Sequence, residues 1–159
     1  MSENFAGGLS AQTRTKLTTL LNETLADTIA LTLAVKQAHW MLKGPGFIGV
    51  HELLDDVADR LRDGADLMAE RCVILGGEAR GTVEAVAEQS RIEPYPTDLE
   101  DIQSHIQELK KRFMAMGETL RKAMAAADDA GDEDTADLLT EVSRAVDKDA
   151  WFIGANAKQ

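Results

Sequence analysis

The chain has 159 residues, which fits one domain, and its 44% hydrophobic content is that of a chain that buries a core rather than staying disordered. Its formal net charge is −11, from 28 acidic and 17 basic side chains, and the bases are scattered, so nucleic-acid binding is not expected and the handling of cations is favoured. No signal peptide, apolar membrane span or disulfide-forming pair of cysteines is present, so we expect a cytoplasmic protein without membrane contact.

Two long helical patterns occupy the first half of the chain, separated by a break at Gly44-Pro45-Gly46. The first helix is predicted over residues 10–43, with Ser10 as its N-cap. The second is predicted over about 48–75, and the glycine pair that follows it supplies a C-terminal cap. Its apolar residues step by three and four, which predicts one buried stripe.

The second half of the chain contains two more long helical patterns after a connection that is too long for a tight turn. Within this connection a short helix is predicted at 82–89. Thr97 and Glu100 match a capping box, which predicts that the third long helix begins there. Gly131 breaks that pattern, and the last helix is predicted over about 132–154.

These elements predict an all-α fold, a ferritin-like four-helix bundle with a short extra helix in the crossover between the second and third long helices. One domain is expected over residues 10–155. A flexible N-terminal tail is expected at 1–9 and a short C-terminal tail at 156–159.

Two of the three histidines flank the first break. His39 lies five residues before Gly44 and His51 lies five residues after Gly46, so an antiparallel hairpin would place them at the same level. Asp55 is one turn beyond His51 on the same side of its helix. Two imidazoles and a carboxylate suit Fe(II), Zn²⁺ or another first-row cation.

A second acidic pair, Asp66 and Glu70, follows on the same helix. Asp55 and Asp66 are eleven residues apart, about 16 Å of helix, so one chain cannot bring both to one metal. About a point between residues 60 and 61, however, Glu70 is the symmetric counterpart of His51, and Asp66 that of Asp55. Two copies of the helix packed antiparallel about a two-fold axis would unite the two halves, and an isologous dimer would hold two identical sites.

Two other interpretations of these residues stay open. A polar strip of this kind is most often a solvated helix face, and the chain would then be a structural bundle whose histidines bind Zn²⁺ or nothing. The symmetry of the strip disfavours that interpretation. A dinuclear site inside one bundle would need Glu-x-x-His, but Lys, Ile and Ile stand three positions before the histidines.

The sequence resembles the Dps family of bacterial mini-ferritins over nearly its whole length. Three segments carry the resemblance: Ala38-His39-Trp40-Met41-Leu42-Lys43-Gly44-Pro45-Gly46-Phe47 with His51-Glu52-Leu53 and Asp55, then Asp66-x-x-x-Glu70-Arg71 with Leu75-Gly76-Gly77, and the ending Asp147-Lys148-Asp149-Ala150-Trp151-Phe152. The spacing His-x11-His-x3-Asp-x10-Asp-x3-Glu is highly specific.

The resemblance implies an iron-storage and detoxification protein. Its catalytic and metal-binding residues would be His39, His51 and Asp55 of one chain with Asp66 and Glu70 of its mate. This ferroxidase site would oxidise Fe(II) with hydrogen peroxide or oxygen, and Zn²⁺ would act there as an inhibitor or substitute. Twelve subunits built from two-fold dimers would form a hollow shell that stores the ferric mineral.

The resemblance also assigns roles to other acidic residues. Asp128, Glu133 and Asp137 would line a three-fold pore through which cations enter. Carboxylates near a helix N-terminus also complement the helix dipole, which is the simpler explanation of this cluster. Glu52 and Asp56 would face the cavity and seed the mineral.

The termini differ from those of DNA-binding members of the family, which usually carry a lysine-rich tail. Residues 1–13 contain no Lys or Arg, and only Lys158 follows Lys148. Direct DNA binding at physiological salt is therefore not expected. The alternative function is that of a nucleoid-binding stress protein, for which association with the nucleoid would replace a purely cytoplasmic location.

Three further residues have simple structural interpretations. Trp40 either fills a contact between subunits or intercepts stray oxidising equivalents near His39. Cys72 falls on the apolar stripe and is expected to be inert. His105 lies outside every pattern and is expected to be a surface or packing residue.

Overall fold

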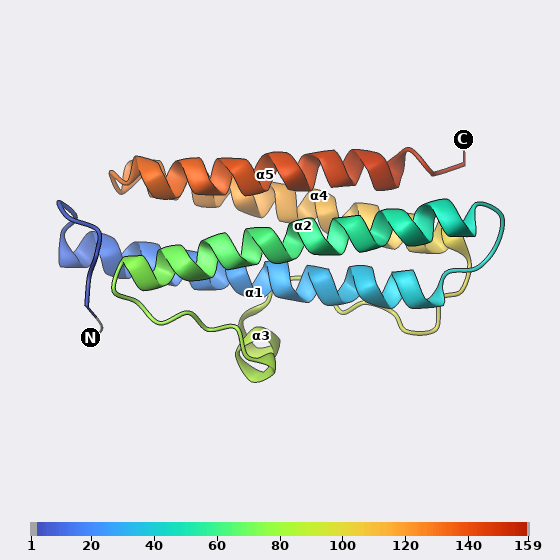
Figure 1. Ribbon diagram of the computed structural model, residues 1–159, viewed down its shortest axis with the longest axis horizontal. Coiled ribbons are helices and arrows are strands. Elements are labelled where there is room, and N and C mark those ends of the chain that lie inside the picture. Colours follow the sequence, from blue (N-terminus) through green and yellow to red (C-terminus); the bar gives the residue numbers. More distant parts are fainter. Residues whose placement is uncertain (1–2, 159) are drawn as a thin grey trace.

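The computed structural model describes residues 3–158, whose four long helices pack as a bundle (Figure 1). These are α1 (Ala11–Met41), α2 (Phe47–Ile74), α4 (Ile102–Asp129) and α5 (Glu133–Gly154). α3 (Val83–Gln89) lies in the crossover, outside the bundle and next to α1 (Figure 1). The part of the chain described contains no strand, which confirms the predicted fold class. Within residues 3–158 no helix is long and apolar enough to cross a membrane.

The bundle consists of two antiparallel pairs, α1 with α2 and α4 with α5 (Figure 1). The pairs pack through α1 on α4 and through α2 on α5, and their apolar faces enclose one core. The side chains that are almost completely buried there include Leu17, Leu21, Leu31, Leu54, Met68, Ile106, Leu109, Phe113, Met116 and Leu120. This single core holds the ends of the helices in register, and the candidate site depends on that register.

Apolar residues recur at every fourth position of α1, but this series does not stay on one face of the helix. Its members are Leu17, Leu21, Leu25, Ile29 and Leu33. Leu17 and Leu21 are fully buried, but Leu33 in the same every-fourth-residue series is 59% exposed. A step of four residues turns about 400°, so the series rotates by about 40° at each step and leaves the core. Leu31 and Val35 take over the core positions, and Leu33 faces outward with Trp40, which is 65% exposed.

α4 begins later than the capping box at Thr97 and Glu100 predicted. Its N-cap is Asp101, whose carboxylate accepts a hydrogen bond from the N–H of Ser104 (2.9 Å). The backbone just before it is bonded to Lys43: the N–H of Lys43 donates to the carbonyl of Glu100 (2.7 Å), and that of Ile102 donates to the carbonyl of Lys43 (3.3 Å). The predicted capping box was wrong because these long-range hydrogen bonds fix the residues before Ile102 in an extended conformation.

The other predicted helix ends agree with the structure to within two residues. Ser10 caps α1 by accepting from the N–H of Thr13 (3.1 Å). The short crossover helix is confirmed, with Thr82 as its N-cap. In α5 the buried apolar residue near the end is Ile153 rather than Phe152, which is only partly buried.

Both described tails contact the bundle. The N–H of Phe5 donates to the carbonyl of Ile74 at the end of α2 (2.9 Å). At the other end, the N–H of Lys158 donates to the side-chain oxygen of Gln103 (2.8 Å). Of the tails predicted at 1–9 and 156–159, residues 1, 2 and 159 lie outside the described residues, and the flexibility of the rest stays a prediction.

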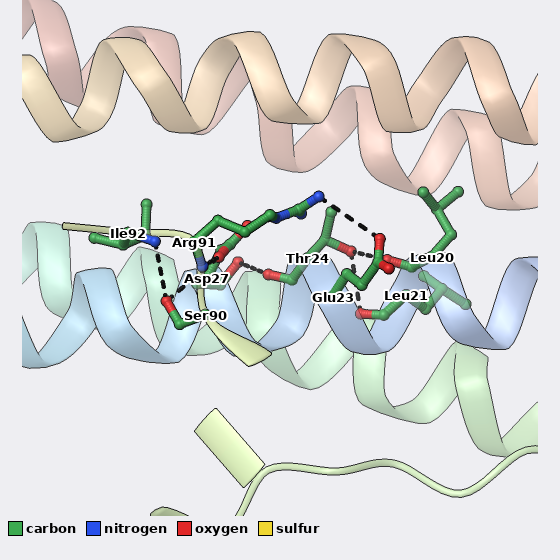
Figure 2. Close-up of polar contacts among 9 residues, drawn as sticks. Leu20, Leu21, Glu23, Thr24, Asp27, Ser90, Arg91 and Ile92 are labelled. Carbon is green, nitrogen blue, oxygen red and sulfur yellow. Dashed lines mark hydrogen bonds and ion pairs between the residues drawn. The ribbon is translucent and has the colours of Figure 1, made fainter. Parts of the chain in front are cut away.

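A buried carboxylate anchors the crossover to α1, as Figure 2 shows. Asp27 is fully buried, and it accepts hydrogen bonds from the backbone N–H of Arg91 (2.6 Å), the Arg91 guanidinium (2.7 and 3.0 Å) and the Ser90 hydroxyl (3.3 Å). The guanidinium also lies 3.6 Å from the carboxylate of Glu23 (Figure 2). A carboxylate this deeply buried is stable only when it is paired and hydrogen-bonded, so Asp27 fixes where the chain leaves α3.

Candidate metal site

A tight turn places His39 and His51 side by side. Gly44 and Gly46 both have positive φ (123° and 83°), which only glycine adopts without strain, and Gly46 is the N-cap of α2. The antiparallel hairpin then stacks the two imidazole rings, with centroids 3.6 Å apart and planes 16° apart. The prediction that the two histidines meet at one level is therefore confirmed.

The two imidazoles are held by reciprocal hydrogen bonds to the backbone. Nδ1 of His39 donates to the carbonyl of His51 (2.7 Å), and Nδ1 of His51 donates to the carbonyl of His39 (2.8 Å). The carbonyl of His39 is in the last turn of α1, where helix carbonyls lack intrahelical partners. Because a carbonyl can only accept, the proton of each neutral imidazole is on Nδ1 and the Nε2 lone pair is available to a cation.

Asp55 completes a half-site with the two histidines. Its Oδ1 lies 3.6 Å from Nε2 of His39, and its side chain is 55% exposed, whereas His39 is almost completely buried. Lys36, one turn before His39, forms an ion pair and hydrogen bond with the same oxygen. The hydrogen bond from Lys36 lowers the pKa of Asp55 below its usual value, with a smaller contribution from His39, so this ligand is a carboxylate at neutral pH.

Lys36 is a part of this half-site that the sequence pattern did not predict. Its side chain is only 17% exposed and lies along α1, and its Nζ is 5.8 Å from the ring centroid of Trp40. The signal that could have found it is its position three residues before His39, which places it on the same face of the helix. An ammonium on Asp55 competes with any cation for that oxygen.

Asp66 and Glu70 lie further along α2 and do not reach the histidines of their own chain. Both are exposed, and within residues 3–158 neither forms an ion pair. Within the same residues no group of three or more His, Cys, Asp or Glu side chains is close enough to hold a metal. One chain thus carries two incomplete sets of ligands at two places along α2, and the first set also includes His39 from α1.

Of the acidic cluster around the turn between α4 and α5, only part is open to solvent. Asp128, Glu133 and Asp137 are exposed, as a pore would require. Asp132 belongs to the same acidic run of the sequence but is only 4% exposed. It accepts two hydrogen bonds from the Arg71 guanidinium, each 2.9 Å. Burial alone would raise the pKa of Asp132, but the hydrogen bonds from Thr135 and Arg71 outweigh it and hold the pKa below its usual value.

The two residues expected to seed mineral, Glu52 and Asp56, are exposed on α2. Close to Asp56, Arg60 donates two hydrogen bonds to a single oxygen of the buried Asp149 (2.6 and 2.9 Å). Burial raises the pKa of Asp149 despite Arg60, and its other oxygen has no hydrogen-bond partner among the described residues. This pair was not predicted, because residues 60 and 149 are far apart in sequence.

Cys72 and His105 are both buried. Cys72 lies in the core as expected, and burial raises the pKa of its thiol, which makes it less reactive. His105 is 1% exposed and hydrogen-bonded, so it lies inside the protein and is not a surface residue. Trp40 is exposed beside the half-site, as either interpretation of it requires.

A bundle with one long crossover and metal-ligand types on facing helices is the architecture of the ferritin-like proteins. The Ferritin family model, described as a ferritin-like domain, matches residues 18–159. A DNA protection during starvation protein from Agrobacterium fabrum is 46% identical over 140 residues, which cover 88% of this chain and 86% of that protein. One from Mycolicibacterium smegmatis is 32% identical over 149 residues, 94% of this chain and 81% of that protein.

Solved structures agree with these sequence comparisons. The Dps structure from Mycobacterium smegmatis in its tetragonal form has a TM-score of 0.94 at 30% identity and covers all of this chain and 96% of its own. DpsC from Streptomyces coelicolor has a TM-score of 0.91 at 33% identity over 98% of this chain and 91% of its own. The chain therefore belongs to the Dps family of ferritin-like proteins.

Proposed function

We propose that this protein is a ferroxidase that stores iron, with its active sites between two-fold-related subunits. His39, His51 and Asp55 of one chain and Asp66 and Glu70 of its mate would bind Fe(II) together. The observation that supports this most strongly is the separation of the ligands along α2: a preorganised dihistidine half-site, shared with α1, lies near its start, and an unpaired acidic half-site lies toward its end. Iron is the substrate and the stored cargo.

The chemistry of the ligands suits the oxidation of iron. Imidazole binds Fe(II), and the anionic oxygens of the three carboxylates stabilise Fe(III) more than Fe(II) because they respond to the higher charge. Two Fe(II) ions supply the two electrons that reduce one hydrogen peroxide to water, which avoids release of hydroxyl radical. Oxygen is the alternative oxidant, and Zn²⁺ would occupy the site without being oxidised.

The surface beside the half-site supports a symmetric partner. Ile29, Leu33 and Trp40 of α1 line a shallow, mostly apolar hollow that continues onto α2 at Arg62 and Ala65. Apolar side chains this exposed are stabilised when a second surface covers them. α2 borders this hollow along the stretch between the two ligand pairs, so a second copy packed about its centre would cover the hollow and align the half-sites.

The direct test is peroxide-driven Fe(II) oxidation after anaerobic loading with iron. Replacing His51 or Glu70 by Ala should slow oxidation severely while the circular dichroism spectrum of the helices stays that of the unmodified protein. If both variants oxidise Fe(II) at the rate of the unmodified protein, these residues do not form the oxidation site. Size-exclusion mass measured in parallel tests the homo-oligomer, which we propose is a dodecamer of two-fold dimers.

Mixed oligomers test whether the site is shared. His51→Ala subunits lack one half-site, and Asp66→Ala/Glu70→Ala subunits lack the other. If the two are unfolded and refolded together with random pairing, half the dimers are mixed and each holds one intact site, so about one quarter of the sites return. A site inside one chain predicts no recovery, since every subunit would still lack ligands.

The acidic residues at the start of α5 fit an entry path for cations. We propose that Asp128, Glu133 and Asp137 line a pore at a three-fold axis of the shell, where their exposed carboxylates would attract Fe(II). We propose Glu52 and Asp56 as the residues that seed ferric mineral on the cavity wall.

The second candidate function is protection of DNA, which is favoured by the name that the relatives carry, DNA protection during starvation protein. The net charge of −11 and the absence of Lys and Arg from residues 1–13 oppose direct binding. We propose that the protein acts in the cytoplasm through iron chemistry without coating DNA. Gel shifts over a series of salt concentrations test this, and a shift that persists at physiological salt would make the nucleoid the site of action.

A further inference from the structure

Tyr95 and His105 form a hydrogen-bonded pair that the ferroxidase proposal does not use. The phenol oxygen of Tyr95 lies 2.7 Å from Nδ1 of His105, and the two rings stack with their centroids 5.9 Å apart. His105 is 1% exposed, and Tyr95 is partly buried against the core. Tyr95 is in the crossover and His105 is on α4, so the pair joins two segments of the chain.

The second hydrogen bond of His105 fixes where its proton lies. Nε2 is 2.9 Å from the carbonyl oxygen of Leu99, which can only accept, so Nε2 carries the proton. Nδ1 is then an unprotonated base, and the Tyr95 hydroxyl donates to it. Burial lowers the pKa of His105, and it raises that of Tyr95, so at neutral pH the pair consists of an uncharged imidazole and an intact phenol.

Two of the charged groups around the pair, Arg112 and Asp101, favour transfer of the phenol proton to His105 when Tyr95 is oxidised, whereas the carboxylate of Glu108 opposes loss of that proton. The Arg112 guanidinium lies 4.9 Å from the Tyr95 ring centroid and is itself held by the carbonyls of Glu93 (3.0 Å) and Pro94 (2.6 Å). A fixed cation over the ring disfavours a positively charged phenol radical. The carboxylates of Glu108 and Asp101 act on Tyr95 and His105 respectively, and that of Asp101 favours a protonated imidazole.

The pair lies at the same end of the bundle as the iron half-site. The bridge between Lys43 and Asp101 fixes the end of α1 against the start of α4. His39 is in the last turn of α1, four residues before Lys43, and His105 is four residues after Asp101, about 6 Å along α4 from that bridge. The two helices pack directly, and helix axes in contact are about 8–10 Å apart.

We propose that Tyr95 and His105 form a redox pair that takes up one-electron oxidising equivalents escaping from the reaction of Fe(II) with peroxide. A hydroxyl radical or comparable oxidant removes one electron from Tyr95, and the phenol proton moves to Nδ1 of His105. The products are a neutral tyrosyl radical, an imidazolium and, from the hydroxyl radical, a hydroxide ion. A further Fe(II) then donates one electron to the radical and becomes Fe(III), and the proton returns from His105 to the phenol oxygen.

The first experiment uses the iron-free protein, so its outcome does not depend on the ferroxidase site. A photogenerated ruthenium(III) tris-bipyridyl complex serves as the one-electron oxidant, and electron paramagnetic resonance detects the radical. Tyr95 is the only tyrosine in the chain, so a tyrosyl spectrum has one source and differs from that of the exposed Trp40 and Trp151. A radical confined to tryptophan in the unmodified protein would overturn the proposal.

His105→Asn is the decisive variant. The asparagine oxygen can accept the Tyr95 hydrogen bond near the position of Nδ1 but has almost no basicity, so it preserves the contact and removes the proton acceptor. A positioned base is worth about 10²–10⁴ in rate, and we expect radical formation to slow by about a hundredfold. Equal rates in a folded His105→Asn protein would show that the histidine is only structural and would overturn the proposal.

The second experiment follows damage during turnover with Fe(II) and hydrogen peroxide. Tyr95→Phe keeps the ring and its contact with Arg112 but removes the hydroxyl. We expect an unchanged rate of Fe(II) oxidation and severalfold more oxidised tryptophan and methionine by mass spectrometry. Damage equal to that of the unmodified protein would overturn the protective role of the pair.

Discussion

Lys36 forms an ion pair with Asp55, the carboxylate that lies beside the two histidines of the half-site. The same oxygen of Asp55 therefore has two competing partners, the ammonium and an incoming cation. In the proposed iron site, binding would therefore require the displacement of Lys36 from this oxygen.

Replacing Lys36 by Gln should strengthen metal binding. The competing ammonium is removed while a polar side chain of similar length remains. Asp55 is about half exposed, and ion pairs open to solvent contribute up to about 1 kcal/mol, so the affinity for Zn²⁺ or anaerobic Fe(II) should rise by up to about fivefold. Isothermal titration measures it. Lys122→Gln, which removes a similar ion pair with Glu118 far from the histidines, is the control and should change nothing. Weaker binding in Lys36→Gln would show that Lys36 supports the site.

His51→Asn separates the structural role of His51 from its role as a ligand. An asparagine amide can donate to the carbonyl of His39 near the position of Nδ1 but offers no nitrogen at the position of Nε2. The variant should keep its thermal stability to within a few degrees and lose ferroxidase activity by at least about a hundredfold, the same loss that we expect for His51→Ala. Retained activity would mean that His51 orients the hairpin but does not bind iron.

Neutralising the proposed pore should affect iron entry but not the oxidation site. In the triple variant Asp128→Asn/Glu133→Gln/Asp137→Asn, uptake of Fe(II) into the mineral should slow by about tenfold, because electrostatic attraction in an acidic cleft raises on-rates by this order. Stopped-flow oxidation at sub-stoichiometric iron and longer mineralisation assays measure the two steps separately. An unchanged uptake rate would contradict a role for these residues in entry.

Arg91 and Asp27 should show unequal sensitivity to substitution. Arg91→Ala leaves the fully buried Asp27 carboxylate without its cation, which costs about 3 kcal/mol, whereas Asp27→Ala frees a guanidinium that is already about half exposed. Urea unfolding at fixed protein concentration should therefore show Arg91→Ala as the less stable variant. The reverse order would mean that the buried carboxylate draws its stability from the Arg91 backbone N–H and Ser90 alone.

The Asp132–Arg71 pair should produce an acid-sensitive part of the stability. Since the pKa of Asp132 is lower in the folded protein than its usual value, its contribution is complete above about pH 4 and is lost as the pH falls through the folded value. Asp132→Asn should lower the melting temperature at pH 7 by several degrees and progressively less at lower pH. Scans from pH 7 to pH 3 test this, and a difference that does not depend on pH would contradict it.

Asp149→Asn is the matched control for that titration. Burial raises the pKa of Asp149, so its ionisation costs stability as the pH rises above about 4, which is the opposite sign. The melting temperature of the variant, relative to the unmodified protein, should therefore rise with pH, whereas that of Asp132→Asn should fall.

The sequence by itself determined the order of the helices and the half-site at the first turn. Both depend on local physics: the apolar period, the N-cap at Ser10 and the two glycines that reverse the chain. Because the spacing of His39 and His51 from that turn is fixed, their meeting at one level could be predicted without coordinates, and the structure adds that their rings stack.

Only the tertiary structure decided which polar side chains are paired. Asp27 with Arg91 and Tyr95 with His105 join segments that the sequence keeps apart, and nothing in their local patterns identifies the partner. For Lys36 with Asp55, the one local signal is the position of Lys36 three residues before His39. The start of α4 was misjudged for the same reason, because hydrogen bonds to Lys43 outweighed a local capping box. The physical reason is that a buried charge or backbone group takes whichever partner the packed helices bring within reach.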